Sequence, residues 1–324
     1  MFKTRFTELF GIEHPIVQGG MQRVSTAELV AAVANAGALG FLSALTQPTP
    51  ADLAVEIKRT QSMTDKPFGV NITLLPTLTP PPYAEYAQVI VDSGVKVVET
   101  AGRSPAPFMA MFNAAGIKVI HKCTSVKHAL KAQSIGCAAV SIDGFEAAGH
   151  PGEEDIPSLV LVPRAVDALD IPMIACGGFS DARGLVAALA LGAEAVSMGT
   201  RFVATKEAPV HINMKRKMVE ASEQDTQLIF RKFGNTARVF KNTIATEVAE
   251  IERRDGTEFD DLASLVAGSR GAVVLETGDL EAGIWWAGIS VGLVDDIPTV
   301  EQLVGRLVDD AEMLISKRLT GMIR

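Results

Sequence analysis

Short apolar runs recur through the first two-thirds of the chain, about 25 to 30 residues apart, and Ala-rich stretches lie between them. These runs predict β-strands at 14–18, 39–43, 68–72, 95–99, 117–122, 138–142, 172–176 and 194–198. Several of them are almost wholly apolar, which is typical of parallel strands that helices cover on both faces.

The stretches between the strands carry helix signals. STAELVAAVANAG (25–37) and DARGLVAALALGA (181–193) begin with a capping residue and end near a glycine. Eight strand–helix steps predict an α/β fold, a (β/α)8 TIM barrel. A doubly wound sheet is the alternative, but no G-x-G-x-x-G follows an early strand and the strand count reaches eight, which favours the barrel.

The regular alternation of predicted strands and helices ends after the eighth strand. Residues 205–295 read as mainly helical, and the first β-like pattern among them is GAVVLET at 271–277. The segment 297–319 predicts a long amphipathic helix that completes the barrel. We therefore expect the barrel in 1–204 and 296–324, and an α-helical insertion, a lid or substrate domain, in 205–295 above the carboxyl ends of the strands.

Composition narrows the class of protein. A net charge of −8 argues against nonspecific nucleic-acid binding, which needs clustered Lys and Arg. Cys123, Cys137 and Cys176 contain no C-x-x-C, so neither a disulfide framework nor a metal site is indicated, and they suit a reducing compartment. No apolar run is long enough for a signal peptide or a membrane span. We expect a cytoplasmic protein that binds no membrane.

Two glycine-bearing turns follow the last two strands, ACGGFSDARG (175–184) and SMGTRF (197–202). Loops at these positions bind phosphate in many barrels, through backbone N–H groups and a helix N-terminus. Gly177 and Gly178 let the backbone approach an anion closely. An isolated double glycine is more often an ordinary tight turn, but glycine turns in two adjacent phosphate-site loops favour an anion site.

Polar residues follow three other strands at the same edge of the barrel. QGGMQ (18–22) offers bare backbone groups that suit the edge of a flat heterocycle. Asn71 and Thr73 lie at the end of strand three, and Lys122 ends strand five. A lysine at this place is either a solvated rim charge or, facing a flavin, a group that stabilises negative charge on the reduced ring.

His150 is the histidine that the pattern singles out. It lies in the loop after strand six, within a Gly-Pro-Gly frame, and as imidazole or imidazolium it suits proton abstraction or donation. Structural roles are favoured for the other histidines, which are His14, His121, His128 and His211. Glu153, Glu154 and Asp155 read as solvent-facing charges, of which only one need tune the histidine. Trp285 and Trp286 either line the substrate cavity or anchor the packing between the two domains.

Four segments together resemble the nitronate monooxygenase family: QGGM (18–21), AAVANAGALG (31–40), DGFEAAGHPGE (143–153) and 175–202. The same superfamily holds NAD(P)H:quinone reductases and a flavin-dependent enoyl-ACP reductase. The resemblance runs from about residue 5 to the C-terminus, and it is specific for the superfamily and its FMN, not for one substrate.

The resemblance implies an FMN-binding barrel with a helical lid, and it implies roles for individual residues. His150 occupies the position of the family's catalytic histidine. Gly20, Met21 and Gln22 would lie along the flavin ring, near Asn71, Thr73 and Lys122. The phosphate and ribityl chain would be held by Gly177, Gly178, Met198, Gly199 and Thr200. Further cofactor-binding positions would be Asp143, Gly149 and Cys176.

The resemblance also ranks the activities. It implies first the oxidation of alkyl nitronates or nitroalkanes with O2 to a carbonyl compound and nitrite. The close alternative is an NADH:quinone reductase. Enoyl-ACP reduction ranks lower, because the acidic chain offers no obvious basic dock for a carrier protein. A flavin-binding sensor without chemistry is a further alternative, against which the framed His150 weighs.

One departure from the family pattern favours the quinone reductase. The chain reads QGGM where better-known nitronate monooxygenases have Q-A-P-M, and TLLPTLTPPPYAEY (73–86) resembles the NADH-dependent branch. The proline-rich stretch around Pro76 predicts a mouth loop that gates nicotinamide entry. The expected partners are a nitronate or a quinone, with NADH and O2, and a homodimer is left open.

Overall fold

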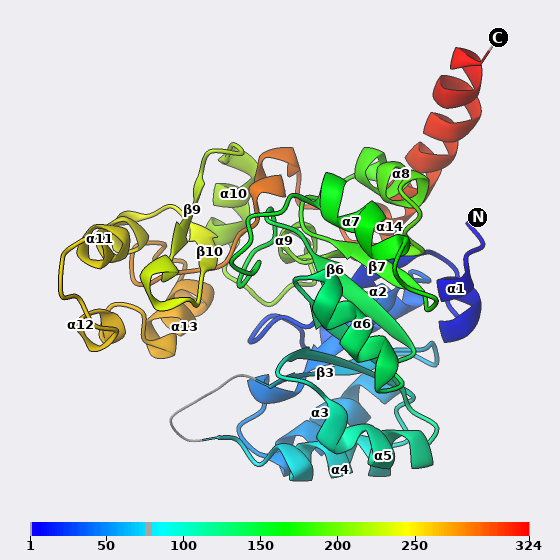
Figure 1. Ribbon diagram of the computed structural model, residues 1–324, viewed down its shortest axis with the longest axis horizontal. Coiled ribbons are helices and arrows are strands. Elements are labelled where there is room, and N and C mark those ends of the chain that lie inside the picture. The colour runs from blue at the N-terminus through cyan, green and yellow to red at the C-terminus, as the bar shows by residue number, and fades with distance from the viewer. Residues whose placement is uncertain (1, 75–79, 324) are drawn as a thin grey trace.

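The computed structural model describes residues 2–74 and 80–323, so the predicted mouth loop at Pro76 lies outside the described residues. The body of the molecule is a closed barrel of eight parallel strands in chain order, in which β8 pairs with β1 (Figure 1). The strands are β1 (Ile16–Gln18), β2 (Leu39–Ser43), β3 (Gly69–Leu74), β4 (Val97–Gly102), β5 (Lys118–Cys123), β6 (Ala139–Asp143), β7 (Met173–Cys176) and β8 (Ala195–Met198). The predicted barrel is confirmed, and each predicted strand overlaps an observed one.

Helices alternate with the strands and cover the outside of the barrel. They are α2 (Ala27–Asn35), α3 (Pro50–Met63), α4 (Tyr83–Asp92), α5 (Ala106–Ala114), α6 (Val126–Ser134), α7 (Ser158–Val166) and α8 (Ala182–Ala190), with a short helix η1 (Ala44–Thr46) after β2. The helices predicted at 25–37 and 181–193 are α2 and α8. At the start of α8 the Asp181 carboxylate accepts the backbone N–H of Gly184 at 3.1 Å, the capping role that its position predicted.

The last helix closes the barrel, as predicted. α14 (Val300–Met313) begins at Thr299, whose hydroxyl caps it, and packs against α8 and α2, the helices that flank the barrel's closure. It continues through η4 (Leu314–Leu319) and η5 (Thr320–Met322), and Figure 1 shows this end leading away from the barrel. Among the described residues, no helix has both the length and the apolar character needed to cross a membrane.

The inside of the barrel is apolar at its amino end. α1 (Arg5–Phe10) lies across this end, where Phe6 and Phe10, with ring centroids 4.6 Å apart, pack against the first inward-facing side chains of the strands. These include Val97, Ile120 and Ile174, all buried.

Strand alternation then turns polar residues into the other end of the barrel. Successive side chains of a strand point to opposite faces. Glu99, Lys122 and Cys176 each lie two positions after one of these apolar residues, so they also point inward, one layer nearer the carboxyl ends. The same rule that packs the barrel core therefore places the polar groups beneath the mouth.

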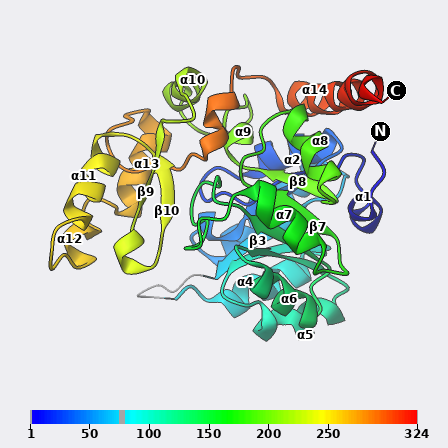
Figure 2. The same cartoon turned by 45° about the horizontal axis from the view of Figure 1, so that its top comes forward.

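The insertion between β8 and α14 contains helices and one hairpin. Its elements are α9 (Thr200–Val203), α10 (Ile212–Glu220), β9 (Thr226–Ile229), η2 (Arg231–Phe233), β10 (Ala237–Phe240), α11 (Thr243–Glu252), α12 (Asp260–Ala263), α13 (Gly268–Thr277) and η3 (Ile289–Leu293). Figure 2 shows α11, α12, α13 and the hairpin together at one side of the barrel. Sequence reasoning missed the antiparallel β9–β10 pair.

The β-like pattern at 271–277 was misleading. This segment is the body of α13, which buries Ala272 and Val274 and leaves Val273 40% exposed. Gly278, at φ +73°, terminates the helix in the left-handed conformation. A run of β-branched residues has only a weak preference for strand, and here the packing of one helix face overrides it.

Candidate active site

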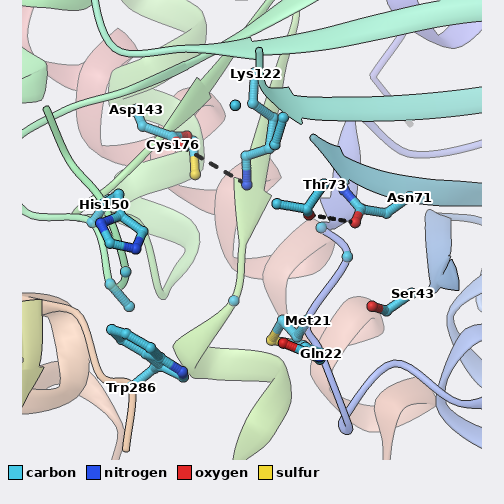
Figure 3. Close-up of a pocket in the computed structure, with 18 of the residues that line it drawn as sticks. Met21, Gln22, Ser43, Asn71, Thr73, Lys122, Asp143, His150, Cys176 and Trp286 are labelled. Atoms are coloured by element: carbon cyan, nitrogen blue, oxygen red, sulfur yellow. Dashed lines mark hydrogen bonds and ion pairs between the residues drawn. The ribbon is translucent and has the colours of Figure 1, made fainter. Parts of the chain in front are cut away.

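A cavity of about 1310 Å³ opens at the carboxyl ends of the strands, between the barrel and the insertion (Figure 3). Every site residue that the sequence singled out lines it: Gly20, Met21, Gln22, Asn71, Thr73, Lys122, Asp143, Gly149, His150, Cys176, Gly177, Gly178, Met198, Gly199 and Thr200. Residues of the insertion, Trp286 among them, complete its wall. Segments up to 266 positions apart in the chain, from Gly20 to Trp286, thus meet at one site.

The glycine turn after β7 has a backbone that a side chain would disturb. Gly177 and Gly178 have φ +89° and +87°, in the left-handed region that glycine alone adopts at little cost. A Cβ on Gly177 would stand 3.0 Å from the carbonyl oxygen of Gly144. Ser158 fixes the turn by donating its hydroxyl to the Gly177 carbonyl at 2.7 Å. The turn is therefore held rigidly, with its bare backbone at the cavity.

The side of the cavity under β5 and β6 holds a buried ion pair. Lys122 Nζ lies 4.0 Å from Asp143 Oδ2, and both side chains are mostly buried. Burial lowers the pKa of Lys122, but electrostatic interactions with Asp143 and, after it, with Cys176 and Glu99 outweigh burial and leave this pKa raised. Asp143 lines the cavity, and its buried Oδ1 finds no partner among the described residues. Buried polar atoms of this kind are normally bonded, so this wall suits a polar ligand.

Glu99 is a site residue that sequence reasoning missed. It is 1% exposed, and its Oε2 accepts the Gly20 backbone N–H at 3.0 Å and Asn71 Nδ2 at 2.7 Å. Thr73 donates to the amide oxygen of Asn71 at 3.0 Å. The N–H of Gly20 and both ends of the Asn71 amide are thus engaged within the protein. The available signal was a single carboxylate in the apolar run VKVVE.

The buried Glu99 carboxyl predicts a pH effect on stability. Burial raises the pKa of Glu99, and Lys122 and the hydrogen bonds from Gly20 and Asn71 only partly oppose this. The folded chain then binds the proton more tightly than the unfolded chain, so this group's contribution to stability falls as pH rises above the unfolded pKa, near 4.5.

We expect Glu99→Gln to remove this loss. The free energy of unfolding of the variant, relative to the wild type, should increase between about pH 5 and about pH 8, by at most about 1.4 kcal/mol per pH unit. Urea unfolding at several pH values measures it. Parallel pH curves for the two proteins would contradict the raised pKa.

The strand-one turn lines the cavity with its backbone and one side chain. The Met21 N–H donates to Ser25 Oγ at 2.8 Å, which fixes the turn. A Cβ on Gly199 would stand 3.6 Å from Met21 Sδ, so the loops after β1 and β8 face each other. Gln22 is exposed at the rim and donates to the Leu45 carbonyl at 3.4 Å.

His150 is tied to the insertion. Its Nδ1 lies 3.1 Å from the carbonyl oxygen of Thr236. A carbonyl oxygen only accepts hydrogen bonds, so Nδ1 carries the proton and Nε2 is the ring nitrogen left for the cavity. In the neutral form Nε2 is a proton acceptor, and in the protonated form it is a donor. Glu153 and Asp155 are not simply solvated, because they contact Thr236 and Arg231 of the insertion.

Both tryptophans line the cavity, but their surroundings differ. Trp285 is 2% exposed and stacks on Phe240, with ring centroids 4.0 Å apart, so it is a packing anchor. Trp286 is 44% exposed, lines the cavity, and has its ring 6.0 Å from that of His150. Figure 3 shows these two rings on the same side of the cavity. They form an aromatic wall with one titratable group.

Two other histidines, His121 and His128, also line the cavity. His121 is 6% exposed and its Nδ1 lies 2.8 Å from Thr100 Oγ1. Burial lowers the pKa of His121 to about 4, so it is neutral at physiological pH. His128 lies on α6, and His211 caps α10 by accepting the N–H of Asn213. His14 lies two residues before the first residue of β1, at the opposite end of the barrel.

The three cysteines are free and buried. Burial raises the pKa of Cys137 to about 12, and it also raises the pKa values of Cys123 and Cys176, with a further contribution from Asp143. We expect all three to resist iodoacetamide in the native protein near neutral pH and to react after unfolding, as mass spectrometry would detect. Rapid labelling of native Cys176 would contradict a buried thiol. Among the described residues, no group of His, Cys, Asp and Glu side chains could hold a metal ion.

Comparison with known proteins agrees with this geometry. A family model described as nitronate monooxygenase matches residues 3–310. The chain belongs to the nitronate monooxygenase family. The family supports a flavin-dependent oxidoreductase, so the cavity is the candidate site for a flavin and a substrate.

Relatives within and around this family carry several names. The chain is 34% identical to (3aS,4S,5R,7aS)-5-hydroxy-7a-methyl-1-oxo-octahydro-1H-indene-4-carboxyl-CoA dehydrogenase of Rhodococcus jostii, over 95% of this chain and 96% of that one. It is 30% identical to a probable nitronate monooxygenase of Staphylococcus aureus, over 91% and 94%. FabK from Thermotoga maritima superposes with a TM-score of 0.92 at 36% identity, with full coverage of both chains. These names describe different substrates.

Proposed function

We propose that the chain is an FMN-dependent oxidoreductase that takes a hydride from NADH and reduces a quinone. The volume of the cavity is the observation that carries this proposal. Sites for one drug-sized ligand span about 300–1,000 Å³, and this cavity has about 1310 Å³. It offers room for a flavin and a second large planar molecule, whereas an alkyl nitronate has only a few heavy atoms. The cavity therefore favours a large second substrate, such as a quinone, over the small nitronate of the activity that the resemblance ranks first.

The residues present fit FMN. Gly177, Gly178, Gly199 and Thr200 would hold its phosphate and ribityl chain, because they offer bare backbone in the two loops where barrels bind phosphate. The unpartnered Asp143 Oδ1 is an acceptor for a polar hydrogen of the cofactor. When bound, FMN supplies a ring that accepts a hydride and passes it on. Lys122, which lines the cavity, would supply a positive charge of the type that stabilises negative charge on a reduced ring.

His150 would move the proton. The overall reaction takes NADH, a proton and a quinone to NAD⁺ and a hydroquinone. The protonated imidazole donates from Nε2 to a carbonyl oxygen of the acceptor, and it takes its next proton from solvent. Trp286, beside it, offers an exposed aromatic face on which a planar acceptor stacks. We propose that residues 205–295 act as the lid or substrate domain that carries this face.

Nitronate oxidation is the second candidate. It is favoured by the family description and by similarity to nitroalkane oxidase of Streptomyces ansochromogenes, at 28% identity with a TM-score of 0.82 over 96% of this chain. His150 would then abstract a proton from a nitroalkane, with O2 as co-substrate. Reduction of an enoyl thioester is the third, favoured by the names of FabK and the CoA dehydrogenase.

Anaerobic mixing of the purified protein with single substrates separates these candidates. We expect NADH to bleach the flavin absorbance rapidly and propyl-2-nitronate to leave it unchanged. A quinone, but not crotonyl-CoA, should then restore the absorbance. Bleaching by the nitronate but not by NADH would overturn the proposal in favour of the second candidate. A colourless protein that releases no FMN on extraction would overturn every candidate named above.

A further inference from the structure

The loop that carries His150 is joined to the insertion like an added strand. Gly149 and Arg238 exchange two backbone hydrogen bonds, of 3.1 Å and 2.6 Å, in an antiparallel bridge. Arg238 also donates to the carbonyl oxygen of Phe145 at 2.9 Å. The loop after β6 and the strand β10 of the insertion therefore form one hydrogen-bonded unit. The position of His150 depends on residues outside the barrel.

Thr236 connects three groups of this unit. It is 1% exposed, its backbone N–H donates to Glu153 Oε1 at 2.8 Å, and its hydroxyl donates to the other carboxylate oxygen. Its carbonyl oxygen accepts from His150 Nδ1. Glu153 thus fixes the peptide unit before Thr236 and the Thr236 side chain. The carbonyl oxygen that accepts from His150 belongs to the same buried residue, so its position depends on these two bonds.

The hydrogen bond to the imidazole selects one tautomer. With Nδ1–H bonded to a carbonyl oxygen, the neutral ring keeps its lone pair on Nε2, which remains available to the cavity. Without that bond the ring can rotate or carry its proton on Nε2, and it then offers the cavity a donor in place of an acceptor. The position of the Thr236 carbonyl therefore decides which kind of group His150 presents.

We propose that Glu153 and Thr236 are positioning residues that hold His150 in its Nδ1-protonated tautomer. The proposal rests on the proposed function in one respect only, namely that His150 is the group that faces the quinone. The neighbouring acids do not share this role. Glu154 is exposed and makes no hydrogen bond or ion pair with any described residue. Asp155 and Arg231 form an exposed ion pair, a kind that contributes little.

The test is the tautomer of His150, measured by NMR of the ring nitrogens in full-length protein labelled with ¹⁵N-histidine, at a pH where the ring is neutral. His150→Asn assigns the signals. We expect Glu153→Ala to shift the ratio of the two tautomers by about five- to tenfold toward the Nε2-protonated form, the bias that one hydrogen bond supports. Glu154→Ala is the matched control and should leave the ratio unchanged.

Thr236→Val is the second variant, because it keeps the carbonyl acceptor and the bond from the Thr236 N–H while it removes the hydroxyl. It should shift the ratio in the same direction by a smaller factor, and it decides the matter if Glu153→Ala does not fold. Equal ratios in the wild type, Thr236→Val and Glu153→Ala would overturn the proposal. Because the readout needs no turnover, a shifted ratio in a protein that NADH does not reduce would refute the proposed function alone.

Discussion

Replacing His150 with Ala should slow the reoxidation of the reduced flavin by quinone about 10²–10⁴-fold, the usual contribution of a positioned proton donor. FMN should stay bound, and reduction by NADH should keep close to its normal rate, because hydride transfer to the flavin needs no proton from His150. Stopped-flow absorbance measures the two half-reactions separately.

Two conservative variants separate the ring nitrogens of His150. His150→Asn keeps a donor near Nδ1 for the Thr236 carbonyl but has nothing at Nε2. His150→Gln places an amide near the position of Nε2. If the reaction needs proton transfer from Nε2, the His150→Asn variant should reoxidise its flavin as slowly as the His150→Ala variant. If both half-reactions slow equally in every variant, the histidine positions a ligand and does not transfer a proton.

The same variants also examine nitronate chemistry. If the protein oxidises nitro compounds, His150→Ala should slow turnover of a neutral nitroalkane far more than turnover of a preformed nitronate, because only the first needs a base. Oxygen consumption with both substrates measures the difference. Equal losses on both substrates would favour anion positioning over proton abstraction.

Gly177→Ala should cause the largest loss of FMN. At φ +89° the side chain strains the backbone, and its Cβ would stand 3.0 Å from the Gly144 carbonyl oxygen, so the turn must shift. The left-handed strain alone costs about 1–2 kcal/mol, which corresponds to a roughly tenfold change in affinity if it is relieved only by moving the turn. The FMN content after gel filtration and the fluorescence titration of the apoprotein with FMN measure the effect.

Gly136→Ala is the matched control for this prediction. Gly136 has φ +92°, but a Cβ there meets only Met109 Cε at 3.9 Å, and the residue does not line the cavity. The backbone strain is then similar, but the residue itself lies outside the cavity lining. This variant should lose some stability and keep its FMN. Equal FMN loss in both variants, or wild-type affinity in Gly177→Ala, would contradict the phosphate cradle.

The barrel was predictable because its signals are local. Each strand of a closed parallel barrel is buried on both faces, so it appears in the sequence as an apolar run whatever its neighbours are. Lys122, Asn71 and the glycine turns were also predictable as site residues, because they lie at the carboxyl ends of those apolar runs. Because the strands are parallel, their carboxyl ends all lie at the same end of the barrel, and every site residue proposed from the sequence therefore lines one cavity.

The insertion was less predictable because its signals compete. The two strands of the β9–β10 hairpin are short. In β9 only Ile229 is fully buried and the other residues are half-buried, while all of β10 is buried, so neither strand shows an alternation of buried and exposed positions. The apolar run in α13 suggested a strand, although it packs one helix face against the rest of the protein. Where local preferences are weak, tertiary contacts decide the element.

By itself, the sequence determined the (β/α)8 barrel, the edge at which its chemistry lies and the residues that line that edge, since strand periodicity and chain direction are properties of consecutive residues. Tertiary structure alone decided that Glu99 binds Gly20 and Asn71, and that His150 takes its tautomer from Thr236, 86 positions away. A hydrogen bond between distant segments leaves no periodic trace in either segment. It exists only once the packed fold brings its donor and its acceptor together.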